Sequence, residues 1–184
     1  MNFWISLIGY QIVWFSAVIG AGHGVIWPGL IAMLLYVSWQ LSISRQRKAD
    51  LLLILTAIVA GCALDGTLLN TGLLSYVVMS PLPMIPPLWI LALWISFSLT
   101  FTQSLQYLQT RLWLAMLLGL FGGPLAYLGA ARGWQVVTFA TPTWHAITSL
   151  AIGWALVTPL LAWLARHWSR SSATDFIHLR GPVS

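Results

Sequence analysis

The chain has 184 residues, of which 59% are hydrophobic, 6% are charged and 12 are tryptophan, and its formal net charge is +5. A water-soluble globular domain of this composition would lack the polar side chains needed to cover its surface, so that class is excluded and a protein of the lipid bilayer is predicted. The positive charge does not indicate nucleic-acid binding, because the basic residues stand singly or in one short cluster between long apolar segments.

Six apolar segments each have about the 20 residues that a helix needs to cross roughly 30 Å of hydrocarbon. We therefore predict an all-α polytopic membrane helix bundle. Its transmembrane domain would occupy residues 1–166 and be followed by a short cytoplasmic tail, 167–184. No basic residue precedes the first apolar segment, which favours a retained helix over a signal peptide. The six predicted spans are approximately 3–20, 25–43, 51–69, 88–105, 112–131 and 144–165.

Basic residues set the predicted orientation. If the connection after the second span faces the cytoplasm, six crossings leave Arg132 as the only basic residue on the far side. This asymmetry follows the positive-inside rule, so both termini are predicted to be cytoplasmic. Five or seven crossings would scatter the same residues over both faces. The predicted cytoplasmic set is Arg45, Arg47, Lys48, Arg111, Arg166, Arg170 and Arg180.

The third span carries a carboxylate at membrane depth. Asp65 is the only acidic residue inside a predicted span, and inserting such a group costs roughly 2.5 to 3.5 kcal/mol. It should therefore be paired, protonated or directed into a polar cavity. Two interpretations stay open: a titrating or ligand-binding group, and an acceptor of hydrogen bonds that holds the bundle together.

The apolar run from Leu51 to Met79 is too long for one straight crossing, because its 29 residues would extend about 43 Å as a helix. We expect a break at Gly66 or within "NTG", residues 70–72, which would bring Asn70 close to Asp65. A short interfacial or re-entrant piece should follow. It would end at the prolines Pro81, Pro83, Pro86 and Pro87.

The fourth span has one polar face. Ser96, Thr100 and Gln103 recur at helical spacing, so this face should point into the bundle. It would either form hydrogen bonds between helices or line a path through them.

The fifth span contains a small-residue pair, Gly119 and Gly123, followed directly by Pro124. Glycines at this spacing let two helices approach closely, and proline cannot donate its backbone hydrogen bond. Packing is one interpretation. The other is a kink that opens an outward-facing pocket, whose wall would carry Tyr127 and Arg132, with Arg132 as the counter-ion of Asp65.

Histidines offer only weak support for a metal site. His23 and His145 would face outward near Asp65, but no histidine pair has a metal-binding spacing. No motif of a serine hydrolase, a nucleotide-binding loop or a c-type haem protein is present. We therefore predict no catalytic residue, no metal and no cofactor, and we place His23 at the rim of the pocket.

Four stretches carry a resemblance to a known family: "NFW" with "GYQIVWFSAVIGA", "DGTLLNTG", "PLWILALWISFSLTFTQSL" and "GGPLAYLGAARGW". Together they resemble a family of small bacterial inner-membrane proteins classed as a domain of unknown function. The resemblance spans most of the chain. It implies a multi-pass protein of the bacterial inner (cytoplasmic) membrane and no assigned activity.

The sequence favours a protein that binds or transports a small or lipidic molecule through an outward-facing polar pocket. Its predicted binding residues are Asp65, Asn70, Tyr127, Arg132 and His23. One alternative is an accessory subunit that docks another membrane protein, and a second is a membrane-embedded enzyme that modifies lipid. The expected partners are the bilayer and such a ligand or protein, without nucleic acid.

Overall fold

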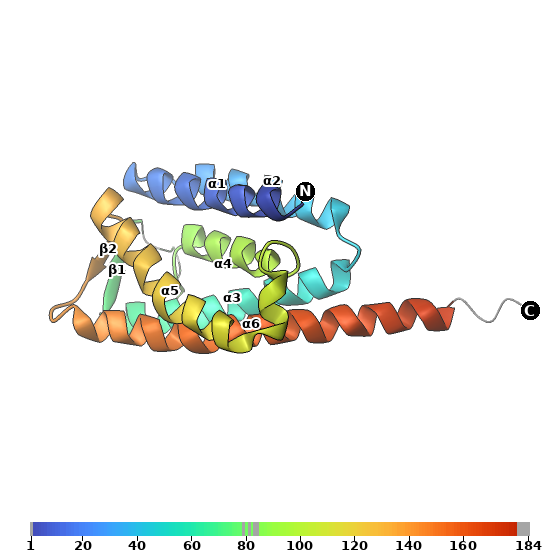
Figure 1. Ribbon diagram of the computed structural model, residues 1–184. Coiled ribbons are helices and arrows are strands. Elements are labelled where there is room, and N and C mark those ends of the chain that lie inside the picture. Colours follow the sequence, from blue (N-terminus) through green and yellow to red (C-terminus); the bar gives the residue numbers. More distant parts are fainter. Residues whose placement is uncertain (1, 79, 81, 83–84, 180–184) are drawn as a thin grey trace, which may run out of the picture.

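The computed structural model describes residues 2–78, 80, 82 and 85–179 (Figure 1). These residues form six α-helices, one short 3-10 helix and two short strands. The predicted helical bundle is confirmed, and the strands are additions that the sequence did not indicate. The elements are α1 (Asn2–Gly22), α2 (Trp27–Ile43), α3 (Arg47–Asn70), β1 (Leu74–Tyr76), α4 (Leu88–Thr100), η1 (Gln106–Thr110), α5 (Leu112–Trp134), β2 (Val137–Phe139) and α6 (Trp144–Leu179).

Proline and glycine define several helix ends. Pro28 lies in the first turn of α2, where its missing N–H breaks no helical hydrogen bond. After α3, Gly72 takes a φ of +71°, a conformation that glycine adopts without steric cost. The break in the long apolar run therefore lies in "NTG". The alternative at Gly66 is wrong, since that residue is buried within α3.

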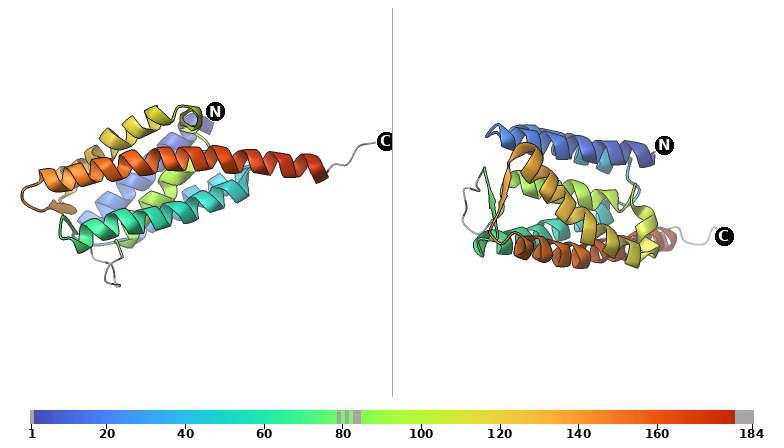
Figure 2. Two further views of the ribbon diagram at one scale, coloured as in Figure 1. Left: turned by 90° about the horizontal axis from the view of Figure 1, so that it is seen from below. Right: turned by 60° about the vertical axis from the view of Figure 1, so that its left-hand side comes forward.

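Successive helices run in opposite directions (Figure 1). The start of α1, the α2–α3 connection and η1 lie at one end of the bundle, and both strands lie at the other. Helix α4 lies between the α1–α2 pair and the α3–α6 pair (Figures 1 and 2). Helix α5 packs mainly on α6 and reaches α1 with its last residue, Trp134, whose ring lies 5.7 Å from that of Trp14 and 5.9 Å from that of Phe15.

The central helix α4 is shorter than predicted. It ends at Thr100, whereas the sequence favoured a span to Leu105. The chain continues through turns into η1, and Gln109 donates a 2.9 Å hydrogen bond to the Phe101 carbonyl. Phe101, Leu108 and Gln109 are buried. Irregular backbone is tolerated at membrane depth when protein covers it, which accounts for this early end.

Four of the described helices are long and apolar enough to cross a membrane: α1, α3, α5 and α6. Helices α2 and α4 are apolar but have only 17 and 13 residues. The molecule is thus a membrane protein. Helices occupy all six predicted segments, but only four of them meet the length of a full crossing.

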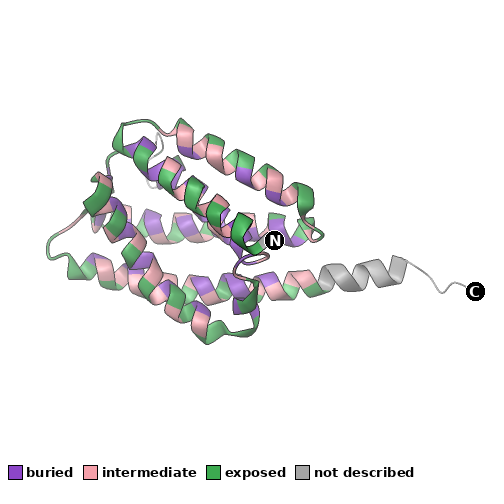
Figure 3. Ribbon diagram, turned by 45° about the horizontal axis from the view of Figure 1, so that its top comes forward, coloured by how far each residue is buried: buried purple, intermediate pink, exposed green. Residues whose placement is uncertain are grey.

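The outer surface of the bundle is apolar. Figure 3 shows exposed residues along the outer faces of the helices, and many of these side chains are large and hydrophobic. Examples are Leu35 on α2, Val59 on α3, Leu125 on α5 and Leu156 on α6, which are 64% to 69% exposed. In water such a surface would be unstable, whereas acyl chains solvate it.

The segment after α3 begins with a short strand, and its predicted interfacial or re-entrant position stays a prediction. Strand β1 pairs antiparallel with β2, with Leu74 opposite Phe139 and Tyr76 opposite Val137. The pairing satisfies the backbone groups that a re-entrant segment would otherwise have to bury unpaired. Of the four prolines predicted to end it, Pro81 and Pro83 lie outside the described residues, and Pro86 and Pro87 directly precede α4.

The glycine pair of α5 is a packing surface. A side chain at Gly119 would collide with the Trp154 carbonyl and the Thr158 hydroxyl, and one at Gly123 would collide with the Trp154 ring. Both glycines are buried, and α6 is the helix with which α5 packs most closely. The packing interpretation of this motif is therefore confirmed.

Helix α6 passes the predicted end of the last span without a break. It runs from Trp144 to Leu179 and extends beyond the other helices at one end (Figure 2). The helix therefore continues past the predicted end of the span at Ala165. Arg180, the last basic residue of the predicted tail, lies outside the described residues. The division into a domain and a tail stays a prediction.

Candidate functional site

Three donors from three elements surround the carboxylate of Asp65. Tyr76 of β1 and Tyr127 of α5 donate hydrogen bonds of 2.7 and 2.5 Å to its Oδ1, and the Trp94 indole of α4 donates one of 2.6 Å to its Oδ2. Asp65 has no exposed surface. Hydrogen bonds to both oxygens compensate for lost hydration, and they join α3 to β1, α4 and α5.

Local structure places each donor. The β1–β2 pairing holds Tyr76 beside the end of α3, and its ring lies edge-on to Trp89 at 5.8 Å. Gly61 lets the Trp94 ring approach α3, because a Cβ at Gly61 would lie 2.6 Å from that ring. Burial, and then the neighbouring Asp65 carboxylate, raise the pKa of the Tyr76 hydroxyl well above its usual value, so Tyr76 stays a proton donor at neutral pH.

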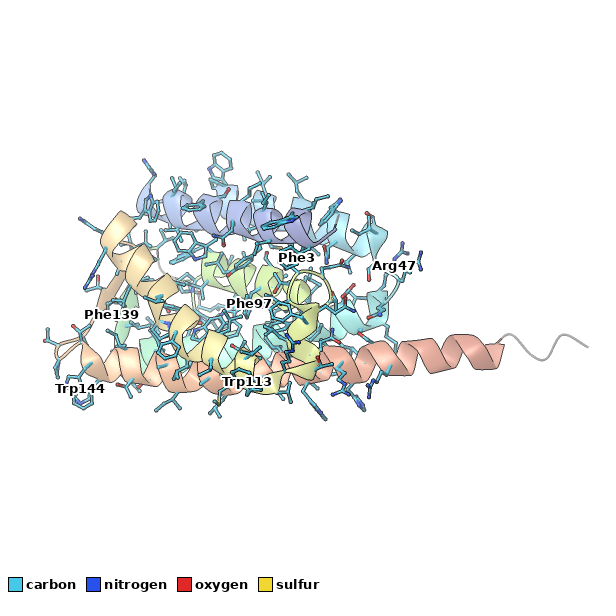
Figure 4. All side chains as sticks on the ribbon, in the orientation of Figure 1. Phe3, Arg47, Phe97, Trp113, Phe139 and Trp144 are labelled. Carbon is cyan, nitrogen blue, oxygen red and sulfur yellow. The ribbon has the colours of Figure 1, made fainter. Side chains whose placement is uncertain are left out.

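A cavity of about 490 Å³ lies between α1, α4, α5 and α6. Most of its wall is apolar or aromatic. Trp94 and Trp154 stack at 4.3 Å in this wall, and Phe97, labelled in Figure 4, lies edge-on to Trp154 at 5.3 Å. Trp94 and Tyr127 both line the cavity and both bond to Asp65, so the carboxylate lies behind the wall and not in the cavity.

The cavity wall includes polar groups without partners. Trp89 Nε1, Trp154 Nε1 and Thr158 Oγ1 are buried and have no hydrogen-bond partner, and all three side chains line the cavity. The Trp154 indole lies near the Tyr127 hydroxyl but does not reach hydrogen-bond geometry with it. Buried polar groups are normally satisfied, so three unpaired ones in the wall of one cavity are unusual.

The sequence matches the family described as "Protein of unknown function (DUF2878)" over residues 3–160. The chain belongs to this family. The resemblance noted from the sequence is thereby confirmed, and the matched residues of this DUF2878 protein extend from α1 into α6 and include the whole cavity wall. No curated protein and no solved structure matches the chain.

Of the predicted binding residues in this DUF2878 chain, Tyr127 alone bonds to Asp65. The prediction that Arg132 is the counter-ion is wrong: Arg132 is exposed on the last turn of α5, and both Asp65 oxygens are occupied by uncharged donors. Tyrosine and indole donors deliver partial positive charge without burying a guanidinium, which would cost far more desolvation energy.

The other two predicted residues also lie elsewhere. Asn70 donates a 2.6 Å hydrogen bond to the Gly66 carbonyl at the end of α3, and it does not line the cavity. His23 is exposed after α1, and its Nδ1 lies 2.9 Å from the Ile19 carbonyl. Neither residue lines the cavity, whose wall is mostly apolar.

His23, His145 and Asp65, which the sequence offered weakly as a metal site, do not come together among the described residues. The described residues contain no cluster of three potential metal ligands of the histidine, cysteine and acidic types. His145 is exposed beside Trp144 at the start of α6, whereas Asp65 is enclosed by its three donors.

Sequence reasoning missed two further buried polar residues. The sequence favoured a cytoplasmic loop at Asp50, but this residue lies in the first turn of α3 and has no exposed surface. Gln40 on α2 is equally buried. Gln40 precedes the basic cluster by a few residues, and Asp50 follows it. If the third helix is taken to begin at Arg47 instead of Leu51, Asp50 falls in its first turn and faces the bundle.

Proposed function

We propose that this protein binds a lipidic molecule in the cavity between α1, α4, α5 and α6. The observation that carries the proposal is the combination of an apolar wall with three unpaired polar groups, on Trp89, Trp154 and Thr158. The volume, about 490 Å³, lies within the range of about 300 to 1,000 Å³ that is usual for small-molecule sites. The apolar wall favours an acyl chain or another hydrocarbon body.

The unpaired groups limit the chemistry of the ligand further. An indole N–H donates hydrogen bonds only, and a threonine hydroxyl both donates and accepts. A ligand that satisfies them should carry acceptor oxygens, such as those of an ester, a carbonyl or an ether. A pure hydrocarbon would leave all three groups unpaired.

The rim of the cavity supports entry from the bilayer. Phe15 on α1 and Leu118 and Leu125 on α5 line the cavity and are 43%, 39% and 64% exposed. These large apolar side chains belong to the same surface that acyl chains would cover. A molecule already dissolved in the membrane would reach the cavity between α1 and α5 without passing through water.

We further propose six crossings of a bacterial inner membrane, with both termini in the cytoplasm. Figure 4 shows Arg47 at the end where α1 begins, and Phe139 and Trp144 at the opposite end. The described basic residues other than Arg132 belong to elements at the Arg47 end, as the positive-inside rule requires. A C-terminal fluorescent-protein fusion should fluoresce and a C-terminal alkaline phosphatase fusion should be inactive; the reverse pattern would contradict this orientation.

Lipid retention in variants of one helix tests the proposed ligand. Gly122 lines the cavity, and a Cβ there meets only Leu118 at an ordinary 3.6 Å, so Gly122→Leu should fill the cavity without disturbing α5. A Cβ at Gly133 would have no atom within 4 Å, and Gly133 does not line the cavity, so Gly133→Leu is the matched control.

The proteins would be taken from nanodiscs of phosphatidylethanolamine and phosphatidylglycerol into mild detergent and examined by native mass spectrometry. We expect a lipid adduct on the wild type and on Gly133→Leu and its loss from Gly122→Leu. Equal adducts on all three proteins, or none on the wild type, would contradict the proposal. The second result would favour the accessory-subunit alternative.

A further inference from the structure

A second buried carboxylate lies at the opposite end of the bundle from the strands. Asp50, in the first turn of α3, has no exposed surface. Neither Asp50 nor its neighbours Gln40 and Thr102 line the lipid cavity. This cluster is therefore separate from the site described above, and its role does not depend on the proposed lipid.

Hydrogen bonds connect Asp50 to the helices on both sides. The Thr102 hydroxyl lies 2.8 Å from Asp50 Oδ1 and 3.1 Å from the Leu99 carbonyl, and it can donate its single proton to either. Gln40 Nε2 donates to the same Leu99 carbonyl at 3.4 Å. Gln40 and Asp50 thus converge on one short stretch of chain at the end of α4.

Each of these two side chains leaves one oxygen without a partner. Asp50 Oδ2 and Gln40 Oε1 are buried and receive no hydrogen bond. Both residues have no exposed surface. Two unpaired acceptor oxygens in one protein interior cost free energy unless a donor or a cation compensates them.

Basic side chains of the adjacent segment do not fill this role. Arg47 donates to the Leu41 and Ser42 carbonyls and is exposed. Arg45 and Lys48 are exposed as well. These three side chains therefore do not compensate the two oxygens.

Neighbouring hydroxyl groups leave the two oxygens unpaired as well. The Ser44 hydroxyl faces Asp50, and its oxygen accepts a 3.0 Å hydrogen bond from the Gln46 backbone N–H, but Asp50 Oδ2 still lacks a hydrogen bond. Further along the same end of the bundle, Ser6 shares hydrogen bonds with Tyr36 at 3.0 Å and with Ser104 at 3.3 Å.

We propose that Asp50 and Gln40 bind a small monovalent cation of the Na⁺ type. Asp50 Oδ2 and Gln40 Oε1 would be its protein ligands, with water completing the coordination. Hard cations take carboxylate and amide oxygens as ligands, and divalent ions such as Ca²⁺ usually gather several carboxylates. A single carboxylate matches a single positive charge.

Thermal stability in different salts tests the cation directly. The full-length protein in detergent would be unfolded in NaCl, KCl, LiCl and choline chloride at equal ionic strength and pH, with its tryptophan fluorescence as the signal. We expect Na⁺ to raise Tm saturably, by about 3 °C at ten times its Kd. Choline should not raise it.

Variants show whether the response arises at this cluster. Asp50→Asn and Gln40→Leu should lose the difference between Na⁺ and choline, and Gln40→Glu should respond at lower Na⁺ concentration because it adds a charged ligand. Gln106→Leu, at an exposed position of η1, is the matched control and should respond as the wild type does. If Asp50→Asn does not fold, Gln40→Leu and Gln40→Glu still show whether the Na⁺ response arises at this cluster.

Two results would overturn the cation site. One is an equal Tm of the wild type in all four salts, which would mean that water or a proton satisfies the two oxygens. The other is a Na⁺ response that survives in Gln40→Leu, which would place the effect elsewhere in the molecule.

Discussion

The two buried carboxylates of the third helix differ in how completely they are bonded. Asp65, near the strand end, receives hydrogen bonds on both oxygens from three separate elements. Asp50, near the opposite end, is bonded to Thr102 on one oxygen and has no partner on the other. Membrane depth alone therefore does not make a carboxylate a ligand site. A buried carboxylate oxygen without a hydrogen-bond partner indicates a ligand site better than membrane depth does.

This difference assigns the two residues different roles. Asp65 acts as a structural junction that fixes Trp94 and Tyr127 in the cavity wall. Asp50 has bonding capacity left for a ligand. The sequence left two interpretations of Asp65 open, and its three hydrogen bonds support the one in which it is an acceptor that holds the bundle together.

The largest effect is expected for Asp65→Ala. The substitution leaves the hydroxyls of Tyr76 and Tyr127 and the Trp94 indole without their acceptor in the interior, which should destabilise the protein by about 3 kcal/mol or more. Thermal unfolding in detergent, followed by tryptophan fluorescence, measures this loss. A Tm within one or two degrees of the wild type would contradict the junction.

A smaller effect is expected for Asp50→Ala in choline chloride. This variant removes one hydrogen bond, to Thr102, but it also removes a buried oxygen that has no partner. The two changes oppose each other, so the net loss should be at most about 1 kcal/mol. Unfolding Asp50→Ala and Asp65→Ala in parallel measures the difference in the stability that each carboxylate contributes. Equal losses of stability in the two variants would show that the two carboxylates play the same structural role.

Tyr127→Phe should cost still less, about 0.6 kcal/mol, which is typical of a single hydrogen bond between membrane helices. The Asp65 oxygen it leaves still accepts from Tyr76, so no acceptor becomes wholly unpaired. Chemical denaturation of the variant in mixed micelles provides the measurement. A loss as large as that of Asp65→Ala would mean that Tyr127 alone maintains the junction.

The smallest effect is expected for Arg132→Ala. This side chain is exposed and takes no part in the Asp65 junction, so its removal should change stability by no more than about 0.5 kcal/mol. The same unfolding assay applies. A loss above about 2 kcal/mol, well beyond the range of ordinary surface substitutions, would restore the ion pair that the sequence predicted.

The helices were predictable because apolar length and flanking turn residues are local signals. Residues 70–72 ended α3 as expected, and Gly119 and Gly123 packed a helix as their spacing indicated. The early end of α4 was not predictable, because it depends on the burial of Phe101 and Gln109 by other helices. Local hydropathy does not show which residues other helices bury.

The site was predictable only in part. Asp65 was identified because a carboxylate in an apolar run is conspicuous, and Tyr127 was placed near it. Tyr76 was not identified as a partner of Asp65, because its position depends on the pairing of β1 with β2 across a long sequence separation. Trp94 lies deep in its predicted span, unlike the tryptophans near the span ends, but its bond to Asp65 was not predictable because it depends on the glycine that faces it, Gly61.

The proposed lipid site can be examined in a density map of the protein in a lipid nanodisc, obtained by electron cryomicroscopy with a bound antibody fragment. We expect elongated density in the cavity between α1 and α5, with its polar part beside Trp89, Trp154 or Thr158. A cavity that is empty, or closed by contact between α1 and α5 along their length, would contradict the proposed lipid site.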